Sequence, residues 1–213
     1  FYKKGARPNE KFYHLKIVVC VGIVMGIHAL FILSTQDIHY NPINMVRYLP
    51  VSLCYIVSMA LSFFGMRFIE ESISDPIENT SGAITSILSV AILGKVISGT
   101  SVIAIIVIVI GILGIGFLDG HGDTDRKKKL GKKIAVIAFA MPFCYAVIDA
   151  LGSFLDIYYL DIELSPLVNV TEDTIETVAN TSYEFTFAVC AVIILVFMWI
   201  KKVRFGISGQ RDK

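Results

Sequence analysis

An acidic side chain inside an apolar run gives this sequence its clearest chemical signal. Asp149 lies about five residues past the centre of the run over 134–155, roughly 7 Å from the midplane of a bilayer whose hydrocarbon core is about 30 Å thick. A carboxylate at that depth costs about 2.5 to 3.5 kcal/mol on insertion, so we expect it to face the interior of a helix bundle. It can bind a cation, a proton or a substrate amine there. It can equally be hydrated near the outer face or hydrogen-bonded to Tyr or Ser, and the sequence leaves both readings open.

Two further apolar runs carry polar or soft side chains at helical spacing. In the run over 46–68 these are Ser52, Tyr55, Met59, Ser62 and Met66. In the run over 76–93, together with the residue before it, they are Asp75, Asn79, Gly82, Ser86 and Ser89. Each set falls on one face of a helix. A polar face in lipid has to look toward neighbouring helices or a hydrated cavity.

These faces and Asp149 predict a substrate pathway. We assign to it Tyr55, Met59, Ser62, Asn79, Gly82, Ser86, Tyr145 and Asp149. The alternative is that the same side chains only form hydrogen bonds between packed helices. The two readings differ in whether the polar residues converge on one hydrated cavity. The residues whose positions decide this are Tyr55, Asn79, Ser86 and Asp149.

The third run begins like a capped helix. Asp75 can accept hydrogen bonds from the free amides at a helix start, and Pro76 suits the first helical position. Glu78 stands three residues after the cap, as in a capping box. For Asp75 and Glu78, capping is therefore favoured over a place in the pathway.

The remaining titratable groups do not form a recognisable catalytic or metal site. His28 lies in the run over 17–33, where an imidazole bonded to a neighbouring helix is favoured, and Glu184 is expected to be an exposed carboxylate at a helix start. The four cysteines lie in apolar runs without metal-ligand spacing. We therefore predict no enzyme activity, no metal and no cofactor. A structure in which His28, Asp149 and Glu184 lie close enough to bind one metal ion would instead support an integral-membrane enzyme.

The composition identifies the class of protein. Of the 213 residues, 55% are apolar and only 17% are charged, which is too hydrophobic for an ordinary soluble domain. We expect an all-α, polytopic membrane helix bundle with six transmembrane helices at about 17–33, 46–68, 76–93, 101–118, 134–155 and 183–200. The expected partners are the lipid bilayer and a small-molecule substrate, with no nucleic acid, and a homodimer is left open.

Basic residues set the expected orientation. Lys and Arg gather in residues 1–16, in the linker 119–133 and in the tail after residue 200, and such clusters are retained on the cytoplasmic side. The segment 156–180 is acidic and contains no Lys or Arg, which suits the outside. The linker 119–133 and the C-terminal tail are thus predicted to be cytoplasmic, in a plasma (inner) membrane.

Three consecutive runs between residues 50 and 118 have a distinctive order. They are a helix ending in MRFIEESISDP, a helix that begins at this Pro and ends in SVAILGK, and a glycine-bearing helix IIVIVIGILGIGFL, in which Gly111 follows Ala104 at a seven-residue spacing. A second copy starts at GKKIAVIAFAMPFCYAVIDALGSF and continues with SYEFTFAVCAVIILVF. This order resembles the third to fifth helices of the EamA-type drug/metabolite transporter superfamily. Members typically carry Gly-Glu where Gly94 is followed here by Lys95.

The resemblance implies a ten-helix fold of two inverted five-helix repeats, with the substrate held between them. Residues 1–118 would hold first-repeat helices and residues 134–213 the start of the second repeat, so we expect the chain to be a piece of a longer protein. The predicted function is a membrane permease or exporter that moves a small metabolite or drug-like solute by alternating access. The alternative is a non-transporting integral-membrane scaffold or assembly subunit.

Overall fold

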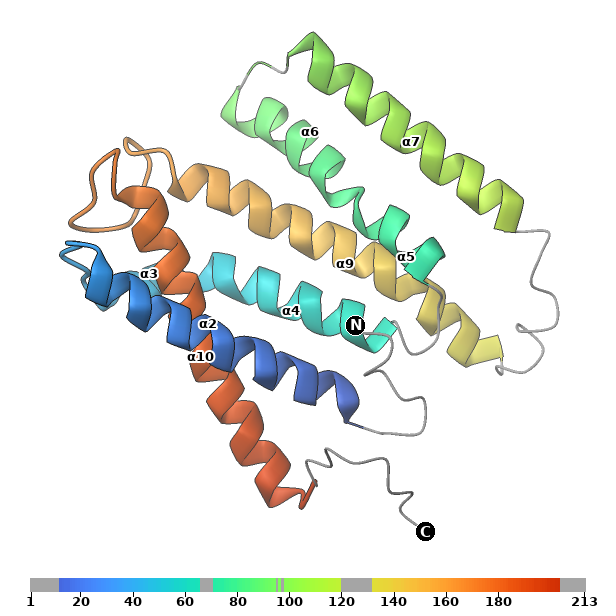
Figure 1. Ribbon diagram of the computed structural model, residues 1–213. Coiled ribbons are helices and arrows are strands. Elements are labelled where there is room, and N and C mark those ends of the chain that lie inside the picture. Colours follow the sequence, from blue (N-terminus) through green and yellow to red (C-terminus); the bar gives the residue numbers. More distant parts are fainter. Residues whose placement is uncertain (1–11, 66–70, 95, 97, 120–131, 204–213) are drawn as a thin grey trace.

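The computed structural model describes residues 12–65, 71–94, 96, 98–119 and 132–203. These residues form helices and irregular connections, and no strand occurs among them. The helices, labelled in Figure 1, are α2 (Tyr13–Thr35), α3 (Ile43–Arg47), α4 (Leu49–Gly65), α5 (Glu71–Glu78), α6 (Ser81–Leu93), α7 (Gly99–Asp119), α9 (Lys132–Tyr159) and α10 (Ile175–Ile200).

Helix α9 is central to the bundle (Figure 1). Helix α4 packs along one side of α9, and α5 and α6 pack along another. Helices α2 and α10 pack against each other, and both contact α4. Helix α7 lies outermost and contacts α5. The faces of α4 and α5 that contact α9 are therefore in the interior of the bundle.

Several helices have the length and composition of membrane spans. Within the described residues, three segments are long and apolar enough to cross a bilayer, and they are His14–Thr35, Ala140–Tyr159 and Ile175–Ile200. The apolar stretches Leu49–Gly65 and Gly99–Gly111 are shorter. The chain is thus an all-helical, multi-pass membrane protein. The expected number of six spans and the inverted repeat stay predictions.

The expected helix over 76–93 is wrong in its start and in its continuity. Helix α5 begins before Pro76, which lies inside it, so Asp75 is not an N-cap. Asn79 and Thr80 then form a turn that separates α5 from α6. The Thr80 amide bonds a carbonyl only three residues back, at 3.1 Å, so the turn is tighter than an α-helix. A proline in the short α5, followed by two poor helix formers, accounts for the interruption.

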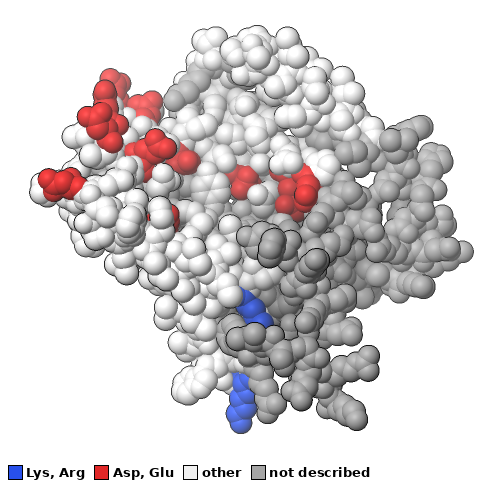
Figure 2. Space-filling model, viewed as in Figure 1, with Lys and Arg blue, Asp and Glu red and all other residues white. Residues whose placement is uncertain are grey.

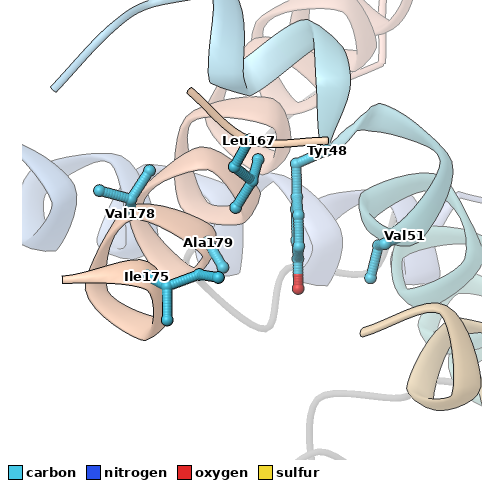
Figure 3. Close-up of a cluster of buried hydrophobic side chains, with 6 residues drawn as sticks. All are labelled: Tyr48, Val51, Leu167, Ile175, Val178 and Ala179. Carbon is cyan, nitrogen blue, oxygen red and sulfur yellow. The ribbon is translucent and has the colours of Figure 1, made fainter. Parts of the chain in front are cut away.

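Helix α10 starts at Ile175 rather than at residue 183 as expected. The charges of this segment suggested a loop, but its apolar side chains are buried. Figure 3 shows the cluster that buries them, which consists of Tyr48, Val51, Leu167, Ile175, Val178 and Ala179. Burial of apolar surface against α4 and the preceding loop thus extends the helix by about two turns.

The loop between α9 and α10 is fixed to α3 by polar contacts. Asn44 is fully buried, and its side-chain amide both donates to the Val168 carbonyl and accepts from the Val168 amide, each at 2.9 Å. The hydroxyl of Tyr48 donates to the Asp156 carboxylate at the end of α9. These contacts hold the loop and the end of α9 against the segment that contains α3.

Most described charged side chains lie toward the two ends of the bundle, and further acidic side chains are visible between these ends in Figure 2. Acidic residues gather around the connection from α9 to α10, and the exposed ones there include Glu163, Glu172, Asp173 and Glu176. Lys16, near the start of α2, and Lys201 and Lys202, after α10, lie at the other end. The basic residues expected to mark the cytoplasmic side at 3–11, at 126–129 and after 203 lie outside the described residues.

Candidate functional site

The interior of the bundle holds two acidic side chains, Asp149 of α9 and Glu78 of α5. Both are partly buried, and they interact electrostatically with each other. Ser58 and Ser62 of α4 lie one helical turn apart, so their hydroxyls point from the same face toward these two carboxylates. We call Asp149, Glu78 and the hydroxyl groups that contact them the carboxylate site.

Glu78 has a hydrogen-bond donor on each of its carboxylate oxygens. Ser62 donates to Oε2 and Ser74, four residues earlier in the same helix, donates to Oε1, both at 2.8 Å. The end of α5 is thereby fixed against α4, next to the interruption at Asn79. Glu78 was predicted to be a capping residue, but in the structure it joins two helices.

Asp149 has fewer donors around it. Its Oδ1 is 3.3 Å from the Ser58 hydroxyl, and that hydroxyl is closer to the Tyr55 carbonyl, at 2.9 Å. A hydroxyl has one proton and gives it to one acceptor at a time, whereas a carboxylate offers about four lone-pair positions. The Tyr145 hydroxyl also interacts with Asp149. Asp149 therefore retains accepting capacity for a ligand.

Aromatic rings stand beside the two carboxylates. The Tyr55 hydroxyl donates to Ser153 at 3.3 Å, and the Tyr55 ring lies edge to face with Tyr183 of α10, with 5.6 Å between centroids. Tyr183 also lies in the neighbourhood of Asp149 and Tyr145. Tyrosine rings offer a negative face and a hydroxyl, which are suited to an organic cation.

Positive side chains lie away from this site in the described part of the chain. Lys16, Lys201 and Lys202 are at one end of the bundle. Arg47 is at the other end and donates to the Pro166 carbonyl at 2.5 Å. Two partly buried carboxylates that influence each other, with no Lys or Arg side chain beside them among the described residues, favour binding of a positive ligand or a proton.

The structure brings together four of the eight predicted pathway residues. Tyr55, Ser62, Tyr145 and Asp149 belong to or border the carboxylate site. Met59 instead packs against the apolar cluster of Val18, Ile56, Phe63 and Phe187. Whether any of these residues lines a pathway stays a prediction.

The other three predicted residues lie away from α9. Asn79 and Gly82 are exposed, and a Cβ atom added at Gly82 would meet nothing within 4 Å. The Ser86 hydroxyl donates to the Gly82 carbonyl of its own helix at 2.9 Å. The turn at Asn79 shifts the helical phase, so the buried face of α6 consists of Ala83, Thr85 and Ser89. The four residues of the convergence test therefore divide, because Tyr55 and Asp149 meet while Asn79 and Ser86 do not join them.

Two residues of the site were missed in the sequence. Ser58 shares a face with Tyr55 and Ser62 at spacings of three and four, so the same helical count that selected Met59 could have selected it. Ser74 precedes Pro76, in a segment that was not expected to be helical. Its spacing of four to Glu78 becomes meaningful only once α5 is known to begin before it.

A second polar contact lies outside the carboxylate site, between α2 and α10. His28 Nδ1 is 2.7 Å from Glu184 Oε1. The expectation that His28 bonds to a neighbouring helix is confirmed. The expectation for Glu184 is wrong, because it lies in the third turn of α10 and its side chain is only 15% exposed. No group of three or more metal-ligating side chains occurs among the described residues, so His28, Asp149 and Glu184 do not form the set that would indicate an enzyme.

Comparison with known proteins gives one family. The model of the EamA-like transporter family matches residues 10–117, just over half of the chain, from before the first described residue to near the end of α7. No curated protein and no solved structure matches the chain.

Proposed function

Because the chain belongs to the EamA-like transporter family, we propose that it carries a small organic cation, such as a protonated amine, across a membrane by alternating access. Membership makes it a membrane transporter of the drug/metabolite kind. The finer proposal concerns the solute and the mechanism. It rests on the carboxylate site, where Asp149 and Glu78 are both partly buried and interact electrostatically.

The arrangement of the site supports a cationic solute in three ways. The two carboxylates supply negative charge at a depth where a lone charge is costly, so a bound cation lowers that cost. The hydroxyl oxygens of Ser58 and Tyr145, which lie beside Asp149, can accept hydrogen bonds from a bound ammonium group. The rings of Tyr55 and Tyr183 can cover the apolar part of an amine.

The position of the site also supports alternating access. The site lies where α4, α5 and α9 come together. It is next to the turn at Asn79 and Thr80 that separates α5 from α6. Interrupted helices near the middle of the membrane are a recurring feature of transporter binding sites. We further propose that residues 1–118 and 134–213 belong to two repeats. The acidic connection between α9 and α10 would then face outward, in a plasma membrane.

The test uses ethidium, a fluorescent organic cation whose charge does not depend on pH. The full chain is purified and reconstituted in liposomes, and binding and uptake of ethidium are measured for the wild type and for Asp149→Asn. We expect uptake to fall at least tenfold in the variant, while membrane insertion improves slightly because a costly charge is removed. Asp173→Asn, in the exposed loop before α10, is the matched control and should behave like the wild type.

Three outcomes would contradict all or part of the proposal. Unchanged ethidium uptake by Asp149→Asn would remove this carboxylate from the mechanism. Binding of ethidium without uptake by the wild type would favour the alternative of a non-transporting membrane scaffold. If the wild type takes up neutral or anionic solutes saturably but not ethidium, the chain is still a transporter, and the proposal that its substrate is a cation is wrong.

A further inference from the structure

Polar contacts join α4 and α9 at three successive levels. They follow one another from the middle of the bundle toward the acidic connection between α9 and α10, and they are Ser58 with Asp149, Tyr55 with Ser153, and Tyr48 with Asp156. The three residues of α9 are spaced by four and three positions, so they lie on one face of that helix. We call this series of contacts the polar row.

The polar row has a carboxylate at each end. Asp149 and Asp156 are seven residues apart, which is two helical turns or about 10 Å. Asp149 lies near the middle of the apolar segment Ala140–Tyr159, whereas Asp156 lies three residues before its end. If α9 crosses the bilayer upright, Asp156 is thus close to the water at the membrane surface. Figure 2 shows acidic side chains between the acidic end of the bundle and its middle.

Asp156 is surrounded by tyrosine rings and keeps room for a ligand. Tyr48 is its hydrogen-bond donor, and no second donor to it occurs among the described residues. The Tyr48 ring lies edge to face with Tyr159 at 5.5 Å between centroids, and Tyr158 lies beside Tyr159 at 6.1 Å. A carboxylate has about four lone-pair positions, and the negative faces of aromatic rings attract cations. These groups suit an organic cation.

A buried hydroxyl without a partner lies between the two upper levels of the polar row. Ser52 follows Tyr48 by four positions and precedes Tyr55 by three, so it shares their face of α4. Its side chain is fully buried, and its Oγ forms no hydrogen bond in the described structure. Buried polar groups in proteins are nearly always paired, so an unpaired one requires an explanation. Ser52 offers an oxygen to a cationic group between the two carboxylates.

We propose that Asp156 and the tyrosine rings around it form an outer cation-binding site, from which an organic cation passes to Asp149 past Ser52 and Tyr55. This inference rests on the proposed function, because the solute is the cation assigned to the carboxylate site. The outer site collects this cation at the membrane surface. Negative side chains that line an approach raise the association rate of a positive ligand by tenfold or more.

The experiment measures how fast ethidium binds. The full chain in detergent at low ionic strength is mixed with ethidium in a stopped-flow instrument, and the fluorescence gives the association rate and the dissociation constant. We expect Asp156→Asn to lower the association rate by about tenfold. The dissociation constant should change less, because the cation still binds at Asp149. Glu163→Gln removes the same charge from the exposed loop after α9 and should retain the wild-type rate.

A second variant separates the outer site from a purely structural contact. In Asp156→Asn the side-chain oxygen still accepts from Tyr48, and only the charge is lost. Tyr48→Phe keeps the ring but removes the hydrogen bond, which frees a position on the carboxylate. We therefore expect Tyr48→Phe to bind ethidium at least as fast as the wild type. If the contact only fixes the end of α9, Tyr48→Phe should instead have the larger effect.

Equilibrium binding shows the outer site by itself. In Asp149→Asn the inner carboxylate is absent, so we expect weaker ethidium binding that remains measurable. The double variant with Asp156→Asn should lose this residual binding. Residual binding of equal strength in the single and the double variant would overturn the outer site.

The other outcomes separate this inference from the function on which it rests. Equal association rates of the wild type and Asp156→Asn, or the same slowing by Tyr48→Phe or Glu163→Gln, would overturn the outer site and leave the cation carrier standing. Absence of ethidium binding by the wild type would overturn both. If Asp156→Asn does not fold, Ser52→Ala replaces it, since this change removes no hydrogen bond of the described structure. It should slow association several-fold, and an unchanged rate would then overturn the outer site.

Discussion

Ser62 of α4 donates a 2.8 Å hydrogen bond to the carboxylate of Glu78 at the end of α5. Hydrogen bonds to charged groups contribute about 1.5 to 3 kcal/mol, and a buried acceptor that loses its donor is destabilising. We therefore expect Ser62→Ala to lower the free energy of unfolding by about 1.5 to 3 kcal/mol, as measured by denaturation of the purified chain in detergent. In the double variant with Glu78→Gln the two effects should not add.

The control for this contact is Ser86→Ala. The Ser86 hydroxyl bonds only a carbonyl of its own helix in the described structure, so its removal should change stability by less than about 0.5 kcal/mol. Equal effects of the two serine changes would show that the Ser62 contact is not a connection between helices.

Helices α2 and α10 meet closely where Gly22 and Gly26 lie against Ala191 and Ala188, a contact called here the glycine seam. Gly22→Ala places a Cβ atom 2.5 Å from Ala191 and 2.8 Å from the Phe187 carbonyl oxygen. Backbone and short side chains cannot move aside cheaply, so we expect a loss of about 1 to 3 kcal/mol in unfolding free energy. Gly111→Ala, where an added Cβ meets nothing within 4 Å, is the control. Equal stability of the two variants would contradict the close approach of α2 and α10.

A third glycine lies beside the carboxylate site. A Cβ atom at Gly152 would be 3.0 Å from the Cys54 Cβ and 3.4 Å from the Tyr55 ring. Gly152→Ala should therefore displace Tyr55 and lower ethidium affinity several-fold with little loss of fold, since the neighbour has to move by only a few tenths of an ångström. Gly82→Ala, in open space, is the comparison, and a greater loss of affinity there would place the site on the other face of α6.

The loop between α9 and α10 depends on Asn44. Replacing it by Ala removes both 2.9 Å hydrogen bonds to Val168 and leaves that amide and carbonyl without their partner. Each unsatisfied buried group costs about 1 to 3 kcal/mol, so we expect Asn44→Ala to unfold at a lower temperature. It should also be cut faster by protease between residues 160 and 174. Asn180→Ala, an exposed change on α10, should do neither.

Much of the fold could be predicted from hydrophobic patterning. Long apolar runs predict membrane helices because backbone groups in lipid have to be satisfied within the segment. The depth of Asp149 in its run predicts an inward position, and the structure places it beside Ser58 and Tyr145. These inferences succeed because they depend on one helix at a time.

The parts that could not be predicted depend on two helices at once. The stripe through Asn79 and Ser86 assumed an unbroken helical phase, and the turn before α6 rotates these residues away from α9. Glu184 looked like a surface carboxylate until α10 was found to start two turns earlier. The spacing of Gly22 and Gly26 is visible in the sequence, but its meaning requires Ala188 and Ala191 on a helix more than 160 residues away.

The glycine seam also limits which parts of the protein can move. Gly22 and Gly26 bring the two backbones so close that a slide by one turn would put a larger residue into at least one of the two contacts, so we expect α2 and α10 to move as one rigid unit. Any rocking that opens the carboxylate site to one side of the membrane then has to occur between this unit and the group around α9. The ring contact of Tyr55 on α4 with Tyr183 on α10 lies on that boundary. Such a motion would therefore have to change this contact.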